Sequence, residues 1–203
     1  MNTNATATAK RTILLVDDDR LVLSTLSRGL TGAGYSVSTA ESADDAEAIL
    51  ASGERPDLAI LDVNMPGRSG LELAERLRSF DHIPFMLLSA YSDQEIVDKA
   101  TAIGALGYLV KPVDTPQLLP AIKSALARAE DIQNLRTTGR QLQVALNNER
   151  EISIAIGITM VQYRLDRKAA FELLRKTARS QNRKLAELAA DVINASETLI
   201  LGA

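Results

Sequence analysis

The chain has 203 residues, of which 46% are apolar, and a formal net charge of −3; this length can bury a real core, as one large domain or two small ones. Cysteine is absent, which excludes disulfides and thiolate metal sites. No apolar run approaches the roughly 18 residues that a membrane-spanning helix needs, so the composition predicts a cytoplasmic protein with no membrane partner.

The first half of the chain alternates between two kinds of segment. Residues 1–10 are polar, lack the apolar core of a signal peptide and are expected to be disordered. Beyond them, short apolar segments predict strands at 12–16, 35–40, 58–62, 85–89 and 107–110. Helical patterns lie between these strands, at about 20–31, 43–52, 70–79 and 93–103. This alternation predicts an α/β domain with a five-stranded parallel sheet that helices cover on both faces.

From residue 115 onward the pattern is helical. Thr115 and Pro116 suit the N-cap and the first helical position, and Pro120 is expected to distort the start of the helix. Apolar residues then recur near heptad spacing, at Leu118, Ala121, Ala125, Ile132, Leu135, Leu142 and Leu146. This spacing indicates a coiled coil over 115–150, although an amphipathic helix that folds back on its own protein explains it equally well. Residues 137–139 could form a break or hinge.

The last part of the chain predicts three further helices. The first runs from about 149 to 162, the second starts after Asp166, and Asn182 could cap the third. A unit of this size needs neighbours or a partner chain for its stability. We therefore expect a small all-α domain over 151–203.

Several polar residues are expected at one edge of the sheet, because the carboxyl ends of parallel strands lie together and ligands gather there. Asp17 and Asp18 follow the first strand, Asp62 ends the third, Ser89 ends the fourth and Lys111 follows the fifth. Three converging carboxylates repel one another unless a cation neutralises them. Oxygen ligands without cysteine or a nearby histidine favour a hard ion, Mg²⁺ above all.

The same edge suits phosphoryl chemistry. Lys111 supplies a point charge for a phosphate oxygen, and the Ser89 hydroxyl could donate to another. An aspartate can itself be the nucleophile and form an aspartyl phosphate, and Asp62 is the best candidate because it closes a central strand. Plain alternatives exist: a solvated acid cluster, a turn residue at 62 and a surface charge at 111. Asp19 and His82 are expected to be a solvated neighbour and an ordinary loop residue.

Four segments carry a resemblance to a known family: "LLVDDD", "LAILDVNMPGRSGLEL", "MLLSA" and "GYLVKPV". Residues 11–127 resemble the receiver domain of two-component response regulators, which has a flavodoxin-like (βα)5 fold. The resemblance implies that Asp62 is the phosphoacceptor and that a sensor histidine kinase supplies the phosphoryl group. It also implies a Mg²⁺ site formed by Asp17, Asp18, Asp62 and the backbone carbonyl of Asn64.

The receiver resemblance assigns further residues. Ser89 and Lys111 would bind the phosphoryl group, and Pro112 would follow a peptide bond that is usually cis in the family. Tyr108 matches the aromatic residue that changes rotamer on activation. Phosphorylation would then shift the face around the fourth helix and the fifth strand.

The charge is distributed unevenly along the chain. Residues 1–127 hold 11 Lys and Arg against 17 Asp and Glu, whereas the segment from Arg164 to Lys184 holds eight basic residues and only two acidic ones. A basic helix face suits a phosphate backbone, although a plain solvated face is the commoner explanation of such a run. Tyr163 and Phe171 could stack on bases, but Phe171 lies on an apolar helix and is better explained as core.

Residues 155–193, "AIGITMVQYRLDRKAAFELLRKTARSQNRKLAELAADVI", resemble the ANTAR domain, a three-helix RNA-binding module that is often joined to a receiver by a coiled coil. ANTAR regulators bind stem-loop RNA in nascent transcripts and prevent transcription termination. The polar candidates for RNA contact are Arg175, Arg179, Asn182, Arg183 and Lys184. Of these, Arg175 and Arg179 are four residues apart and share one helix face.

The combined prediction is a non-enzymatic response regulator with a disordered segment at 1–10, a receiver domain at 11–127, a coiled-coil linker at 115–150 and an ANTAR-like domain at 151–203. Its expected partners are a sensor histidine kinase, stem-loop RNA and a second copy that pairs through the coiled coil. Two alternatives keep the receiver: a DNA-binding transcription factor, and a phosphorelay or protein-interaction module. A binding protein rather than phosphorylation could also be the dominant control.

Overall fold

The computed structural model describes residues 10–90 and 94–200, and side chains in the last helix as far as Ser196. The chain forms two compact units, one up to Gln133 and the other from Asn134. The first unit has two apolar clusters and the second has one of its own. The expected disordered segment at 1–10 lies, except for Lys10, outside the described residues.

The first unit is built on a five-stranded parallel sheet with the strand order β2-β1-β3-β4-β5. Its strands are β1 Thr12–Val16, β2 Ser36–Ala40, β3 Leu58–Asp62, β4 Phe85–Ser89 and β5 Tyr108–Val110. Every residue of β3 and β4 is buried, because central parallel strands have helices on both faces. The five-stranded parallel sheet predicted from the alternating pattern is therefore confirmed, and its strand order is that of the flavodoxin-like fold implied by the receiver resemblance.

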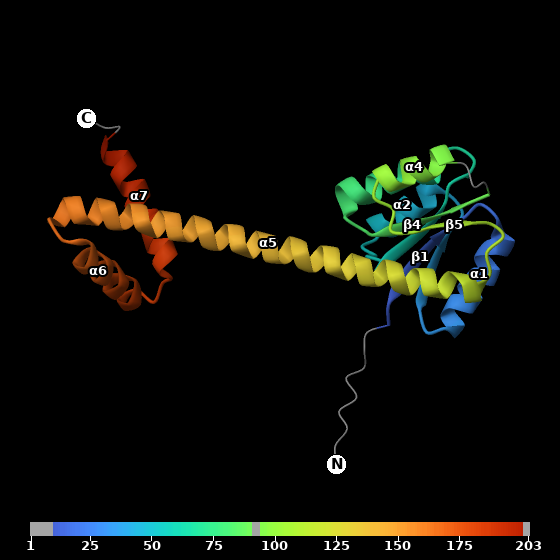
Figure 1. The fold of residues 1–203 in the computed structure, drawn as a ribbon, viewed down its shortest axis with the longest axis horizontal. Coiled ribbons are helices and arrows are strands. Elements are labelled where there is room, and N and C mark those ends of the chain that lie inside the picture. The colour runs from blue at the N-terminus through green and yellow to red at the C-terminus, as the bar shows by residue number, and fades with distance from the viewer. Residues whose placement is uncertain (1–9, 91–93, 201–203) are drawn as a thin grey trace, which may run out of the picture. The chain divides into compact units, whose positions relative to one another are not determined.

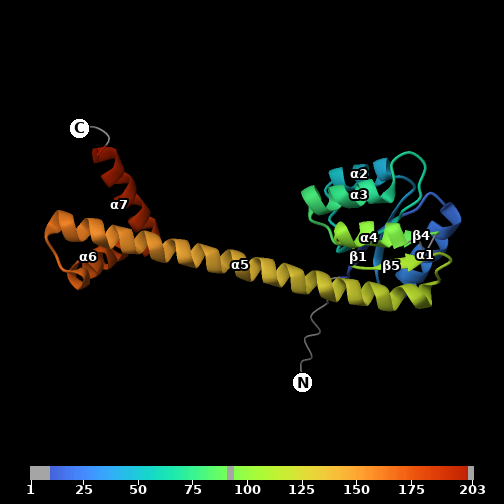
Figure 2. The ribbon, with the colours of Figure 1, turned by 45° about the horizontal axis from the view of Figure 1, so that its top comes forward.

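Helices cover both faces of the sheet (Figure 1, Figure 2). They are α1 Arg20–Gly32, α2 Ala43–Ala51, α3 Gly70–Arg76, the π-helical turn η1 Leu77–Asp81, α4 Gln94–Ala102 and the start of α5 Thr115–Tyr163. One apolar cluster joins α2, α3 and α4 to the sheet through residues such as Leu50, Leu73 and Ala100. The other joins α1 and α5 to the opposite face through residues such as Leu26 and Ile122. Full burial of each such leucine stabilises the fold by about 1.5–3 kcal/mol.

The first helix begins where predicted, but at two helix starts the capping residue differs from the sequence analysis. Asp19, expected to be a solvated neighbour, is the N-cap of α1, and its Oδ1 accepts a hydrogen bond from the N–H of Leu21 at 2.8 Å. Asp114 rather than Thr115 caps α5, because its Oδ1 accepts from the N–H of Gln117 at 2.9 Å. Aspartate and threonine both serve as N-caps, so the sequence pattern could not choose between two neighbouring candidates.

The predicted third helix ends differently from the prediction. α3 ends at Arg76, and the chain continues as η1 to Asp81. His82 then takes a left-handed conformation with a φ of 54°, and its Nδ1 lies 3.0 Å from the carbonyl oxygen of Arg78. The only histidine thus has a local role in ending this helical segment.

The long helix α5 runs without interruption through its 49 residues. The predicted break at 137–139 is therefore wrong, and the predicted helix at 149–162 is the last part of α5. Gly139 costs a helix about 1 kcal/mol relative to alanine, but good helix formers such as Arg140 and Gln141 follow it, so the helix continues. In the described part of the chain, no helix combines the length and the apolar character needed to span a lipid bilayer.

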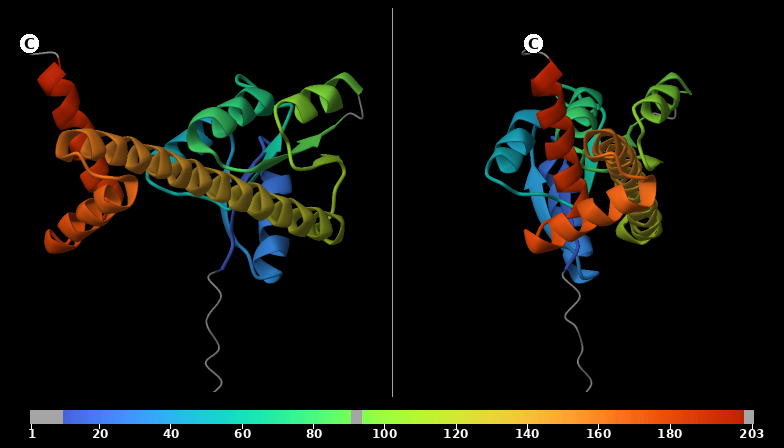
Figure 3. Two further views of the ribbon diagram at one scale, coloured as in Figure 1. Left: turned by 60° about the vertical axis from the view of Figure 1, so that its left-hand side comes forward. Right: turned by 90° about the vertical axis from the view of Figure 1, so that its left-hand side faces the viewer.

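The second unit contains the last part of α5 together with α6 Arg167–Ser180 and α7 Leu185–Ile200 (Figure 3). Its core is small and rich in alanine, and consists of Ala155, Ile156, Ala170, Leu174, Ala178, Leu188 and Ala189. Small side chains at the contact allow the helices to approach closely. Asp166 caps α6, and its Oδ1 accepts from the N–H of Ala169 at 2.7 Å. The C-terminal region is therefore helical, as predicted.

Asn182 does not cap α7, contrary to the prediction. Its φ of 52° is left-handed, and its N–H donates to the carbonyl oxygen of Arg179 at 3.1 Å. The N–H of Arg183 donates to the carbonyl oxygen of Ala178 at 3.0 Å. This pattern ends α6, at a position where asparagine is often found in place of glycine.

Candidate functional site

Two buried acids lie at the carboxyl edge of the sheet. Asp17 directly follows β1 and Asp62 is the last residue of β3, and their exposed fractions are 0% and 4%. Asp18 is exposed. One carboxylate oxygen from each of the three acids lies within 4.8 Å of the others. The fold thus brings together residues that are 45 positions apart in the chain.

Lys111 lies between the two buried acids. Its Nζ is 2.6 Å from Oδ2 of Asp17 and 2.6 Å from Oδ2 of Asp62. Its N–H donates to the carbonyl oxygen of Ser89 at 2.7 Å, which extends the pairing of β5 with β4. The peptide bond between Lys111 and Pro112 is cis. The end of β5 therefore directs one ammonium group at both acids.

The electrostatics of this edge couple the lysine to its acids. Burial raises the pKa of Asp17, and the hydrogen bonds from Lys111 and from the N–H of Asp19 offset only part of that effect. Burial acts to lower the pKa of Lys111, but its bonds to Asp17 and Asp62 outweigh burial and raise that pKa. Lys111 is therefore held as a cation. One ammonium does not balance three carboxylates, so the edge has a surplus of negative charge.

The carboxylates are also oriented by the backbone. Oδ1 of Asp17 accepts from the N–H of Asp19 at 3.0 Å, and Oδ1 of Asp62 accepts from the N–H of Asn64 at 3.1 Å. The carboxylate of Asp18 forms no hydrogen bond or ion pair with the described residues. An oriented set of oxygen donors with surplus negative charge fits Mg²⁺, which prefers such ligands.

Exposed basic residues gather on α6 in the second unit. Arg175, Lys176 and Arg179 line a shallow groove of about 380 Å³. Arg175 also pairs with Glu172, with 3.4 Å between Nη1 and Oε1. The three cations therefore form a local basic surface on this helix, at which Arg175 is partly neutralised.

The predicted RNA contacts that follow α6 have different environments. The guanidinium of Arg183 pairs with acids of α7, with 2.6 Å between its Nη2 and Oδ2 of Asp191. Lys184 is exposed just before α7, and Asn182 is exposed in the turn. The five predicted residues thus lie on α6 and on the turn that follows it, but they are not equally accessible to a partner's phosphates.

Family models match both parts of the chain. Residues 13–123 match the response regulator receiver domain, and residues 140–193 match the ANTAR domain. The chain belongs to the response regulator family. In this response regulator the receiver match spans the sheet and its acidic edge, and the ANTAR match spans the last part of α5, α6 and the first half of α7.

The response regulator is similar to known proteins over different lengths. The transcriptional regulatory protein PdtaR of Mycobacterium tuberculosis (strain ATCC 25618 / H37Rv) is 31% identical over 195 residues, which are 94% of this chain and 95% of PdtaR. The transcriptional regulatory protein AfsQ1 of Streptomyces coelicolor is 39% identical over 118 residues, 58% of this chain and 52% of AfsQ1. The similarity to PdtaR therefore extends over both domains.

Solved structures support the receiver fold. A CheY-like response regulator receiver domain protein from Methanospirillum hungatei JF-1 has a TM-score of 0.56 and 30% identity, and the match covers 61% of this chain and 98% of that one. Chemotaxis response regulator CheY4 of Vibrio cholerae has a TM-score of 0.53 and 33% identity, covering 57% and 98%.

Ser89 and Tyr108 lie on the strands next to the acidic edge of the receiver. Ser89 is the fully buried last residue of β4. Leu88 of β4 lies opposite Asp62, so Ser89 is one strand away from the candidate phosphoacceptor. Tyr108 begins β5, is half-buried and packs against the apolar cluster of α2, α3 and α4. Ser89 therefore lies on the strand next to Asp62, and Tyr108 begins the strand beyond it.

Gly70 positions the acidic edge and was not identified from the sequence. It begins α3, and its N–H donates to the carbonyl oxygen of Val63 at 3.2 Å. A Cβ at this position would collide with the backbone carbonyl of Asp62. The available signal was the capping box that Ser69 and Glu72 form around it. Gly70 thus allows α3 to begin directly against the end of β3.

Proposed function

We propose that this protein is cytoplasmic, that a sensor histidine kinase phosphorylates Asp62, and that the ANTAR domain then binds stem-loop RNA in a nascent transcript and prevents transcription termination. The observation that carries this proposal is the placement of Asp62 at the end of the central strand, 2.6 Å from Lys111 and beside Asp17 and Asp18. The two family matches support it, and PdtaR is itself named a transcriptional regulatory protein.

The proposed phosphoryl transfer uses residues of this edge. An Oδ atom of Asp62 attacks the phosphorus of a phosphohistidine, so that an O–P bond forms, the N–P bond breaks and the leaving imidazole nitrogen is protonated from water. Lys111 holds one oxygen of the incoming group, and the Ser89 hydroxyl donates to another. Mg²⁺ held by the three acids and the carbonyl of Asn64 would neutralise charge on the transferring group.

The proposed output depends on a changed pairing of two copies. A phosphorylated Asp62 carries a new dianionic group near Ser89 and Tyr108, which gives the two states different contacts. The linker over 115–150 exposes leucines at 135, 142 and 146, which provide an apolar surface for a second copy. Pairing would bring two ANTAR domains to adjacent stem-loops and increase affinity through effective concentration.

The decisive experiment labels the full chain with acetyl phosphate and Mg²⁺. We expect Asp62→Asn to abolish acyl-phosphate labelling, because the amide cannot accept the phosphoryl group. Asp19→Asn is the matched control, since it removes an acid of the same triplet, retains a good N-cap for α1 and should label normally. Undiminished labelling of the Asp62→Asn variant at another residue would refute the assignment.

A further inference from the structure

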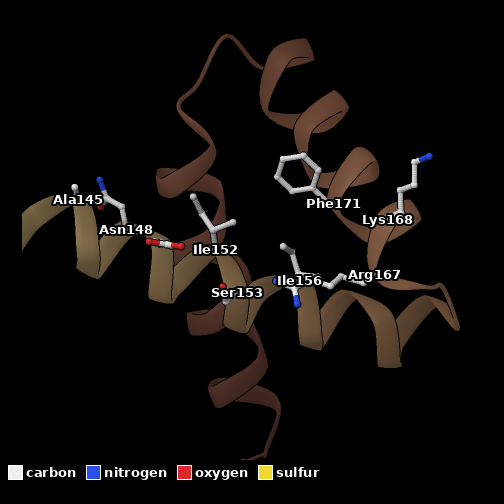
Figure 4. Close-up of a pocket in the computed structure, with 9 residues that line it drawn as sticks. Ala145, Asn148, Ile152, Ser153, Ile156, Arg167, Lys168 and Phe171 are labelled. Carbon is white, nitrogen blue, oxygen red and sulfur yellow. The ribbon is translucent and has the colours of Figure 1, made fainter.

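A cavity of about 790 Å³, widely open to solvent, lies in the ANTAR domain between the last part of α5 and the first turns of α6 (Figure 4). This volume is within the range of roughly 300–1,000 Å³ that small-ligand pockets occupy. Ile152 and Ile156 of α5 and Phe171 of α6 form its apolar walls. The cavity is distinct from the acidic edge and from the shallow basic groove that contains Arg175.

Phe171 has two environments at once. It is partly buried and packs against the apolar cluster of the domain, as the sequence led us to expect. It also lines the cavity and points from α6 toward Ile152 of α5 (Figure 4). An aromatic ring beside branched aliphatic side chains is a surface on which a planar nucleobase stacks favourably.

Unpaired cations flank the aromatic wall. Arg167 and Lys168 line the cavity, and both are exposed and form no ion pair with the residues that the structure describes. Asp166 already occupies the N-cap of α6, so side chains rather than free backbone N–H groups provide the positive charge. Lys168 and Arg175 lie three and four residues from Phe171, and therefore on its side of the helix. A phosphate backbone that follows these cations would pass beside the cavity.

The α5 side of the cavity is polar in a different way. Asn148, Glu149 and Ser153 line it. A carboxylate only accepts hydrogen bonds and repels phosphate, so Glu149 disfavours a phosphate on this side and suits a base edge that presents N–H groups. The two sides thus match the two ends of a nucleotide: cations at α6 for the phosphate, and acceptors at α5 for the base.

We propose that this cavity receives an unpaired base from the loop of the stem-loop RNA, stacked on Phe171, with the adjoining phosphates on Arg167 and Lys168. The inference rests on the proposed RNA-binding function and specifies where the loop is read. A second copy is a less suitable occupant, because Leu135, Leu142 and Leu146, the exposed apolar residues proposed for pairing, do not line the cavity.

The first test needs no variant. The full chain, labelled at isoleucine methyl groups, is titrated with guanosine 5′-monophosphate and, separately, with ribose 5-phosphate, which has the phosphate but no base. We expect the methyl resonances of Ile152 and Ile156 to shift with the nucleotide and not with the sugar phosphate. Equal shifts with both compounds, or shifts confined to other isoleucines, would overturn the proposal.

The second test measures affinity for a hairpin RNA that the wild-type full chain has selected from a library with randomised loops. Phe171→Leu keeps an apolar side chain in the core but removes the stacking surface, so affinity should fall roughly 5- to 150-fold while the salt dependence is unchanged. Phe80→Leu, the identical change at an exposed phenylalanine of the receiver that does not line the cavity, should leave affinity unchanged.

The outcomes separate the two proposals. If no hairpin is selected, RNA binding fails, and the nucleotide titration still reports on the cavity. If a hairpin binds Phe171→Leu as tightly as wild type, the cavity proposal fails alone. Equal losses from the changes at Phe171 and Phe80, or a loss of dimer by sedimentation in place of a loss of RNA affinity, would also contradict it. Thermal unfolding of each variant identifies any that fail to fold, in which case the titration decides.

Discussion

Single residues in this response regulator often have a structural role that a motif does not reveal. Asn182 and Arg183 are adjacent in a basic segment, which favoured RNA contact for both. The structure uses the left-handed conformation of Asn182 to end α6 and pairs Arg183 with Asp191. A cation that is already paired gains less from a phosphate than an unpaired cation does. Arg183 should therefore contribute less to RNA binding than an unpaired cation of the same segment.

At the residue scale, we predict that Arg175→Ala and Lys184→Ala each weaken binding of hairpin RNA. Lys184→Ala should lower the slope of log K against log salt by about one, because one phosphate contact is lost. Arg175→Ala should lower it by somewhat less, because Glu172 partly neutralises its guanidinium. Arg183→Ala should lower the slope less, since its guanidinium pairs with α7. Filter binding measures these slopes between about 50 mM and 200 mM salt, the range in which they are usually read. Duplex DNA of the stem sequence serves as the comparison. An unchanged slope for Arg175→Ala and Lys184→Ala would exclude direct phosphate contact.

At the scale of elements, α5 serves more than one purpose along its length. Its first turns bury Leu118 and Ile122 against the sheet, and its last turns bury Ala155 and Ile156 against α6. Between these ends, Leu135, Leu142 and Leu146 are 73%, 62% and 54% exposed. Because burying a leucine is worth roughly 1.5–3 kcal/mol, such exposure on a helix favours a second copy as the covering surface.

For this element, Leu142→Lys should weaken the proposed dimer at least about tenfold, because a charge replaces an apolar side chain at the pairing surface. The measurement is sedimentation equilibrium of the full chain with and without acetyl phosphate. Gln141→Lys is the matched control, since it adds the same charge on another side of α5 and should leave pairing unchanged. A monomeric wild type in both conditions would contradict the pairing model.

At the scale of the whole molecule, the two units have separate cores, so each should unfold in its own transition. In the receiver, Glu47 of α2 is 2.8 Å from Arg68 and 2.7 Å from Arg76. The hydrogen bond from Arg68 lowers the pKa of Glu47, burial acts against this effect, and Arg76 adds to it. This network ties α2 to α3 by charge.

We therefore predict that acid weakens the receiver partly through Glu47. Because the pKa of Glu47 is lower in the folded state, its contribution is present above the ordinary pKa of 4.5 and is lost as pH falls through the folded value. Glu47→Gln should reduce the loss of receiver stability at low pH, measured as the free energy of unfolding in urea. It should leave the ANTAR transition unchanged. Glu75→Gln, an exposed glutamate of α3 without an ion pair in the described part, is the control. An equal loss of receiver stability at low pH in wild type and in Glu47→Gln would refute the prediction.

The sequence by itself determined the sheet and its acidic edge. Strands at 12–16, 58–62 and 85–89 were predicted with the bounds observed, because short apolar segments separated by helical patterns have few other ways to be buried. Once the strands are parallel, the residues that end them lie at one edge, so Asp17, Asp62 and Lys111 could be brought together without coordinates.

Only the tertiary structure decided how those residues are paired and what surrounds them. The contact of Lys111 with both buried acids, the close approach that requires Gly70, and the cavity beside Phe171 each depend on distances between elements that are far apart in the chain. The continuity of α5 and the conformation of Asn182 were likewise decided by packing and backbone geometry. A one-dimensional pattern records which side chains are available, whereas separation, burial and orientation arise when helices pack on a sheet or on one another.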